Sequence, residues 1–114
     1  GHNPPLLFEA REAGRPQELT RTGMPLGILD DARWEQGTAQ IEPGDALVLY
    51  SDGVTEAQGL EEVVFGQKRL LDALEESLGS AAQVVQEAVL AEIQEFVGDA
   101  PQFDDITLVV ITRM

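Results

Sequence analysis

The chain has 114 residues, enough for one domain or part of one, and its hydrophobic fraction of 43% is too high for a disordered tail. The absence of cysteine excludes a disulfide framework and a cysteine-ligated zinc site. Twenty-one acidic residues against seven basic ones give a formal net charge of −14, so nucleic acid and anionic membranes are not expected partners, whereas cations and basic protein surfaces are.

The first third of the chain has the character of strands and turns. Leu6–Arg11 predicts a strand, and a turn follows at Gly14–Pro16. Gly23–Ile28 contains too much glycine and proline for a regular element and is interpreted as a loop. Trp34–Ile41 predicts a second, partly exposed strand, with Trp34 in the core or on a sheet face.

A turn and a buried strand come next. Glu42–Asp45 has Pro and Gly at the two central positions of a β-turn. Ala46–Tyr50 is apolar without alternation, which is typical of a strand buried on both faces, and Tyr50 is expected in the core or on a sheet face. The run stops at Ser51-Asp52-Gly53.

Two helices follow, joined by a very short connection. The first is predicted from about Gln67 to Leu78, with Gly79 as its C-terminal cap. Ser80 and Gln83 predict a capping box at the start of the second helix, which Gly98 closes. The side chains that share a face are Leu70, Leu71, Leu74 and Leu78 on the first helix and Val85, Val89, Ile93 and Phe96 on the second.

The last element is a strand. A loop containing Pro101 leads to Ile106–Ile111, another apolar run that predicts a buried strand. Strands, then a helical hairpin, then one strand indicate an α+β fold, in which the hairpin packs on one face of an antiparallel sheet. No apolar run approaches the roughly 20 residues that cross a bilayer, and no signal peptide is recognisable, so we expect a soluble, cytoplasmic protein.

Acidic residues are expected to meet at one end of this sheet. Asp52 follows the strand Ala46–Tyr50, and the helical hairpin returns the chain to the same end, where Asp104 and Asp105 precede the last strand. Neighbouring carboxylates repel each other unless a cation compensates, and Mg²⁺ and Mn²⁺ prefer oxygen ligands. Gly53 lets the backbone bend beside them. The same residues also occur as plain turn and loop residues, so spacing alone leaves both interpretations open.

Six motifs occur in one order along nearly the whole chain. They are Gly1-His2-Asn3-Pro4-Pro5-Leu6-Leu7, Gly23-Met24-Pro25-Leu26-Gly27-Ile28, Pro43-Gly44-Asp45, Leu49-Tyr50-Ser51-Asp52-Gly53-Val54-Thr55-Glu56-Ala57, Phe65-Gly66 with Arg69-Leu70, and Asp104-Asp105-Ile106-Thr107-Leu108. Together they make the chain resemble the C-terminal half of the SpoIIE-type branch of the PPM metal-dependent serine/threonine protein phosphatases.

The resemblance implies a fold and a reaction. The fold is a sandwich of two antiparallel β-sheets flanked by helices, with a binuclear Mn²⁺ or Mg²⁺ site at one edge. The reaction is hydrolysis of phosphoserine or phosphothreonine on a protein by a water that the metals activate, with no catalytic Ser or Cys. The expected substrate is an anti-sigma-factor antagonist in bacterial partner switching, a form of sigma-factor regulation.

The resemblance also assigns roles to individual residues. Asp52 and Asp104 match the family's metal aspartates, and Asp105 is a second ligand or an orienting group. Gly53 shapes the backbone of the site, and Glu56 is expected to be solvated or capping instead of a ligand. His2, the one histidine, is expected to be structural or disordered at the terminus instead of an acid catalyst.

The chain departs from the family in one large respect. The aspartate motifs of the family's upstream half are absent, so residues 1–114 are expected to be the C-terminal portion of a phosphatase domain and nearly inactive alone. The main alternative is a non-catalytic phosphatase-like interaction module that dimerises through open strand edges. A third interpretation is a simple acidic cation-binding domain.

Overall fold

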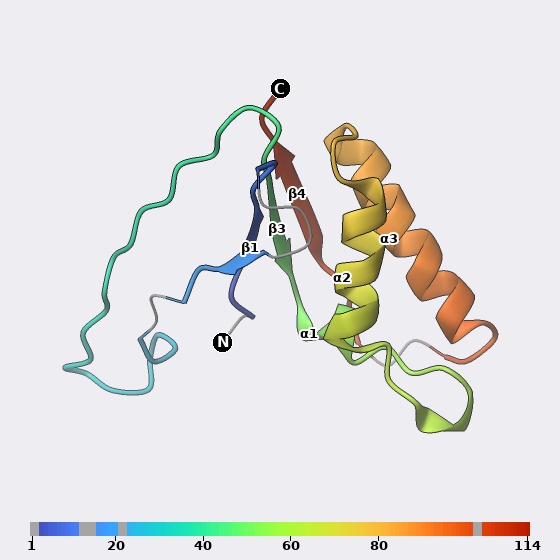
Figure 1. Ribbon diagram of the computed structural model, residues 1–114. Helices are drawn as coiled ribbons and strands as arrows, with labels where there is room; N and C mark the ends of the chain where they lie inside the picture. The colour runs from blue at the N-terminus through green and yellow to red at the C-terminus, as the bar shows by residue number, and fades with distance from the viewer. Residues whose placement is uncertain (1–2, 12–15, 21–22, 102–103) are drawn as a thin grey trace.

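A computed structural model describes residues 3–11, 16–20, 23–101 and 104–114, and shows one sheet with two helices against one of its faces (Figure 1). The elements in chain order are β1 (Leu6–Phe8), β2 (Gln17–Glu18), β3 (Ala46–Tyr50), α1 (Asp52–Thr55), the 3₁₀ turn η1 (Leu60–Glu62), α2 (Gly66–Ser77), α3 (Ala82–Val97) and β4 (Leu108–Thr112). The predictions for His2 and for most of the turn at Gly14–Pro16 lie outside the described residues.

The sheet is antiparallel throughout, in the order β2-β1-β3-β4. Strand β3 pairs with the edge strand β4 in a register that sets Ala46 opposite Thr112 and Tyr50 opposite Leu108. The predicted antiparallel pairing of these two apolar runs is therefore confirmed. Three bounds differ: β1 ends at Phe8 instead of Arg11, and β4 spans Leu108–Thr112 instead of Ile106–Ile111.

Helices α2 and α3 lie side by side along one face of the sheet, as the α+β prediction required (Figure 1). The side chains that meet between the layers alternate along each strand and recur at helical spacing. They include Leu6, Phe8, Val48, Tyr50, Leu70, Leu74, Val85, Val89 and Ile93, each less than a tenth exposed. The predicted helical stripes thus form the core, and Tyr50 belongs to it.

The opposite face of the sheet is partly open, which corrects one prediction. Leu47 and Leu49 of β3 are half-buried on that face, and Val109 and Ile111 of β4 are 44% and 45% exposed. We call these four residues the outer sheet face. The expectation that the two apolar runs are buried on both sides was wrong for the described chain, because the helices cover only one side.

The predicted strand at Trp34–Ile41 was also wrong. This segment has no regular structure and lies apart from the sheet as an extended stretch that leads back toward the start of β3 (Figure 1). A strand needs a neighbour for its backbone groups, and none of the strands described pairs with it. Trp34 is 49% exposed instead of buried, and its indole nitrogen donates to the carbonyl of Met24 at 2.6 Å.

Glycines occupy the predicted turn before β3 and the C-terminal ends of α2 and α3. Gly44 has a φ of 92° in the turn, while Gly79 and Gly98 have positive φ after α2 and α3, as their capping roles require. The capping box was wrong. The amide of Ser80 instead donates to Ser77 at the end of α2, and α3 begins at Ala82. In the described part of the chain, none of the helices combines the length and apolarity that a membrane crossing requires.

Candidate metal centre

Ser51 joins the end of β3 to the chain that leads into β4. Its amide donates to the carbonyl of Thr107 at 3.0 Å, and the amide of Thr107 donates back to the Ser51 hydroxyl at 3.0 Å. The same hydroxyl donates to the carbonyl of Asp105 at 3.4 Å. These contacts extend the strand pairing beyond the last sheet residue. We call the two joined segments, residues 51–53 and 104–107, the acidic rim.

Gly53 makes the close approach of the two segments possible. A Cβ on this residue would collide with the carbonyl oxygen of Asp105, so any side chain would push the segments apart. Gly53 itself is buried although its neighbour Asp52 is exposed. The expectation that a glycine shapes this backbone therefore has a direct steric basis.

The Asp52 carboxylate projects from the first turn of α1 and is exposed. The side-chain amide of Asn3 donates to one of its oxygens, Oδ1, at 2.7 Å. The backbone carbonyl of Asp52 accepts from the amide of Glu56 at 2.8 Å, which closes the short helix. The side chain is thus contacted by Asn3, while the backbone of Asp52 is held within α1.

Asp104 and Asp105 lie across the rim from Asp52, and both are exposed. The amide of Asp105 donates to Oδ1 of Asp104 at 2.8 Å, so the two residues form one local unit. The structure therefore brings the three sequence-predicted acidic residues to one end of the sheet. Their roles as ligands stay predictions.

The donor set of the rim fits a hard divalent cation, because carboxylate oxygens in contact with solvent suit ions that keep several bound waters. Within the part of the chain described, however, no group of three Asp, Glu, His or Cys side chains is close enough to hold a metal ion together. A binuclear centre at this place requires further ligands.

A cleft of about 730 Å³ borders the acidic rim. Gly53 and Asp104 of the rim line it together with Glu56, and α3 contributes apolar residues that include Leu90 and Val97. We call it the rim cleft. It has room for an uncharged part of a ligand whose charged group lies at the rim. Sequence reasoning missed it, because it forms only where α1, α3 and the loop after α3 meet.

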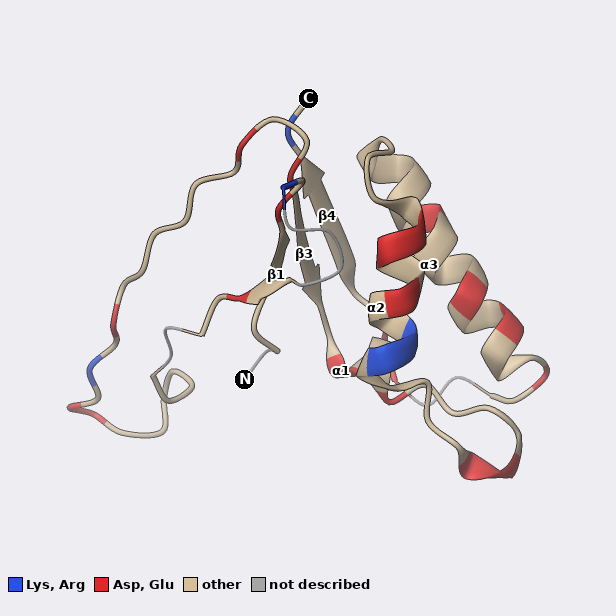
Figure 2. Ribbon diagram, in the orientation of Figure 1, with Lys and Arg blue, Asp and Glu red and all other residues tan. Residues whose placement is uncertain are grey.

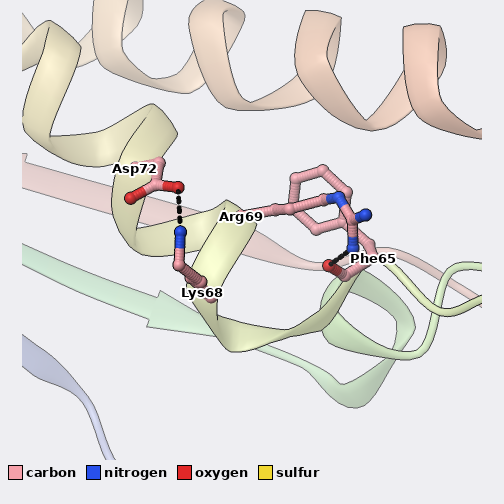
Figure 3. A network of polar contacts seen from close by, with 4 residues as sticks. All are labelled: Phe65, Lys68, Arg69 and Asp72. Carbon is pink, nitrogen blue, oxygen red and sulfur yellow. Dashed lines mark hydrogen bonds and ion pairs between the residues drawn. The ribbon is translucent and has the colours of Figure 1, made fainter.

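Arg69 contacts the loop before α2, and Figure 3 shows its hydrogen bond to Phe65. Its guanidinium donates to the carbonyls of Phe65 and Val64 at 3.0 and 3.2 Å and lies 4.5 Å from the ring centroid of Phe96. The Phe65 and Phe96 rings meet edge to face at 5.6 Å. Because Val64 lines the cleft, this cluster fixes the position of that wall.

Asp45 is a buried carboxylate that does not belong to the rim, since it precedes β3 and the rim follows it. It accepts hydrogen bonds from the amides of Ala10 at 2.8 Å and Glu42 at 2.9 Å. These bonds, together with the charges of Arg11 and Arg113, hold the pKa of Asp45 below its usual value, while burial acts in the opposite direction. The aspartate of the Pro-Gly-Asp motif is therefore explained by a structural role in the turn before β3.

An antiparallel sheet covered by two helices, with aspartates after one central strand and before its neighbour, is the arrangement of the PPM metal-dependent protein phosphatases. The chain belongs to the SpoIIE family within this class, because the family described as Stage II sporulation protein E (SpoIIE) matches residues 1–114.

Two curated proteins are similar in sequence. One is Phosphoserine phosphatase RsbU of Bacillus subtilis, 32% identical over 116 residues, which cover 99% of this chain and 33% of that protein. The other is Protein IcfG of Synechocystis sp., 28% identical over 113 residues, which cover 99% of this chain and 17% of that protein. The chain thus spans a third or less of the curated relatives it matches.

Two solved structures share the fold. The SiaA-PP2C domain of Pseudomonas aeruginosa superimposes with a TM-score of 0.75 at 23% identity, over 100% of this chain and 44% of that one. The phosphatase domain of SpoIIE from Bacillus subtilis, from a manganese-presoaked sample, gives a TM-score of 0.67 at 18% identity, over 99% of this chain and 47% of that one. The chain therefore shares its fold with a part of each solved structure that amounts to less than half of that structure's length.

Proposed function

We propose that the protein containing these residues hydrolyses phosphoserine or phosphothreonine on another protein with the help of Mn²⁺ or Mg²⁺. The observation that carries the proposal is the acidic rim, where Ser51 joins the Asp52 segment to the Asp104–Asp105 segment. Membership of the SpoIIE family and the similarity to a phosphoserine phosphatase support it.

Asp52, Asp104 and Asp105 are the proposed metal-binding residues. When bound, the cations supply a Lewis acid that activates water and stabilises the phosphoryl oxygens. The chain's own contribution is positional: Ser51 and Gly53 set the spacing of the two acidic segments. The rim cleft is placed to receive an uncharged part of the phosphoprotein next to its phosphorylated residue.

The chain is proposed to be the C-terminal portion of the catalytic domain. The outer sheet face leaves Val109 and Ile111 nearly half exposed, an apolar surface that a second sheet would bury. The extended stretch Trp34–Ile41 also lacks a partner among the strands described. Upstream strands would supply both that cover and the ligands that complete a binuclear site.

The proposed substrate is a cytoplasmic phosphoprotein, an anti-sigma-factor antagonist in bacterial partner switching. Acidic residues are spread over α2, α3 and the loops, with few basic residues among them (Figure 2). Such a surface attracts a basic protein face and repels other polyanions. The similarity to RsbU, a phosphoserine phosphatase, supports a phosphoserine-containing substrate.

The outer sheet face also favours a second candidate, an interaction module that assembles with a copy of itself. Light scattering during size-exclusion chromatography distinguishes the interaction module from the phosphatase, with the substitution Ile111→Lys as a probe. A dimer that Ile111→Lys converts to monomer would favour the module. A monomer that gains activity only when upstream sequence is present favours the enzyme.

The direct test is phosphate release from a phosphoserine protein in the presence of Mn²⁺. We expect turnover by the complete phosphatase domain and almost none by residues 1–114 alone. Robust Mn²⁺-dependent turnover by the 114 residues would contradict the proposed division of the site. No turnover by the complete domain would contradict the phosphatase proposal itself.

A further inference from the structure

Asn3 lies at the acidic rim although 49 residues separate it from Asp52 along the chain. The pairing of β1 with β3 sets Leu6 opposite Val48. Continued for three residues toward the N-terminus, this antiparallel register places Asn3 opposite Ser51. The side-chain amide of Asn3 then reaches Oδ1 of Asp52 at 2.7 Å.

The backbone around Asn3 is stiff, which favours a fixed side chain. Pro4 follows directly and restricts Asn3 to extended backbone, and Pro4 and Pro5 have their own φ angles fixed by their rings. The carbonyl of Pro5 accepts from the amide of Leu19 at 3.0 Å, which ties this segment to the neighbouring strand β2. The amide of Asn3 is therefore presented to Asp52 at low cost in conformational entropy.

The chemistry of this contact suits a carboxylate that has to bind a cation. An amide donates a hydrogen bond without carrying a charge, so it leaves the negative charge of Asp52 intact. It occupies one carboxylate oxygen and fixes the rotation of the group, which leaves Oδ2 for a ligand. Groups that orient metal ligands in this way typically change metal affinity by about 10- to 100-fold.

We propose that Asn3 is a positioning residue that orients the Asp52 carboxylate toward a divalent cation at the acidic rim. The inference rests on the proposed function, because it assumes that Asp52 binds the cation. Sequence reasoning had weighed the neighbouring His2 in the same motif and gave Asn3 no role, since the register that brings Asn3 to Asp52 is not visible in the motif.

The test is a Mn²⁺ titration of the isotope-labelled complete phosphatase domain, monitored by the paramagnetic broadening of the Asp52 and Asp105 amide resonances. Asn3→Leu keeps the shape of the side chain and removes the donor. We expect the Mn²⁺ concentration at half-broadening to rise about tenfold, the lower end of the range for such groups. Asn3→Gln, which keeps an amide, is expected to recover part of the affinity.

Gln83→Leu is the matched control, because Gln83 donates a similar amide hydrogen bond to Glu87 at 2.9 Å on α3. It should leave the rim resonances unchanged. An Asn3→Leu variant that binds Mn²⁺ like the wild type overturns the inference. So does one whose melting temperature falls while its folded fraction binds normally, since that shows a purely structural role.

Asp52→Asn separates this inference from the proposed function. If Asp52→Asn abolishes the broadening and Asn3→Leu does not change it, only the positioning role fails. If Asp52→Asn leaves the broadening unchanged, Asp52 is no ligand, and both the metal site and the role of Asn3 are contradicted.

Discussion

The hydroxyl of Ser51 accepts a hydrogen bond from the amide of Thr107 at 3.0 Å, and this contact joins the two segments that carry the acidic residues of the rim. Because Asp52 follows Ser51 directly and Asp105 lies two residues before Thr107, the bond sets the separation of the proposed ligands. The distance between the two acidic segments is thus set by the hydrogen bonds that continue the pairing of β3 with β4.

Ser51→Ala is expected to loosen the rim. The substitution removes the hydroxyl that accepts from Thr107 and donates to Asp105, which costs about 1 kcal/mol of unfolding free energy. Chemical denaturation measures this loss, and a Mn²⁺ titration measures the accompanying fall in affinity. Thr55→Val, at the end of the adjoining helix α1, is the control, because the Thr55 hydroxyl makes only a long contact of 3.5 Å. Equal effects of the two substitutions would contradict the role of Ser51.

Gly53→Ala is expected to destabilise the chain by about 1–3 kcal/mol, since the added methyl group meets the Asp105 carbonyl and the backbone has to move. Gly79→Ala is an instructive comparison. At Gly79 the space is open but φ is +88°, so the cost there comes from backbone conformation alone. Gly53→Ala should also shift the amide resonance of Asp105, whereas Gly79→Ala should not. An unshifted Asp105 resonance in Gly53→Ala would show that the close approach is absent.

Asp45 is expected to make stability depend on pH in acid. Its pKa is lowered in the folded chain, first by the amide of Ala10 and then by that of Glu42. A group with a depressed folded pKa contributes stability that is fully present above its unfolded pKa, about 3.9 for aspartate. That stability is lost as the pH falls through the folded pKa. Melting temperatures measured from neutral pH downward should therefore fall more steeply for the wild type than for Asp45→Asn, and parallel curves would contradict this account.

Arg69→Ala is expected to cost about 1–2 kcal/mol, because two carbonyl hydrogen bonds and the contact with the Phe96 ring are lost. Arg69→Lys should not restore the loss, since an ammonium lacks the planar fork of a guanidinium. The neighbouring Lys68 provides the control: it is 90% exposed and paired with Asp72 at 3.3 Å, so Lys68→Ala should be nearly neutral (Figure 3). A neutral Arg69→Ala in thermal denaturation would show that the cluster does not hold the cleft wall.

Sequence reasoning succeeded where a pattern is local. The run Ala46–Tyr50 and the apolar spacing of the two helices lie within single elements, so β3, α2 and α3 were predicted close to their observed bounds. The placement of Asp52 and Asp105 at the same end of the sheet was predicted from the direction of the chain, because the helical hairpin returns it to the end where β3 stops. Each of these inferences needs only the neighbours in sequence or the direction of a connection.

The predictions that failed depend on partners distant in the chain. Trp34–Ile41 has strand-like composition but no neighbour to pair with among the strands described. The exposure of Val109 and Ile111 on the outer sheet face depends on which elements pack against that face, and a local apolar run does not reveal this. The hydrogen bond of Asn3 depends on strand register, which no motif reveals. The short elements β2 and α1 were missed because two and four residues carry no periodicity.

The measurement that tests the central claim most directly is Mn²⁺-dependent release of phosphate from a phosphoserine protein by the complete phosphatase domain carrying Asp52→Asn. We expect this substitution to abolish turnover, and Asp72→Asn on the exposed side of α2 to leave it unchanged. Both proteins should melt at wild-type temperatures, so that a difference reflects the site and not the fold. Full Mn²⁺-dependent activity in a correctly folded Asp52→Asn domain would contradict the assignment of the acidic rim as the catalytic metal site.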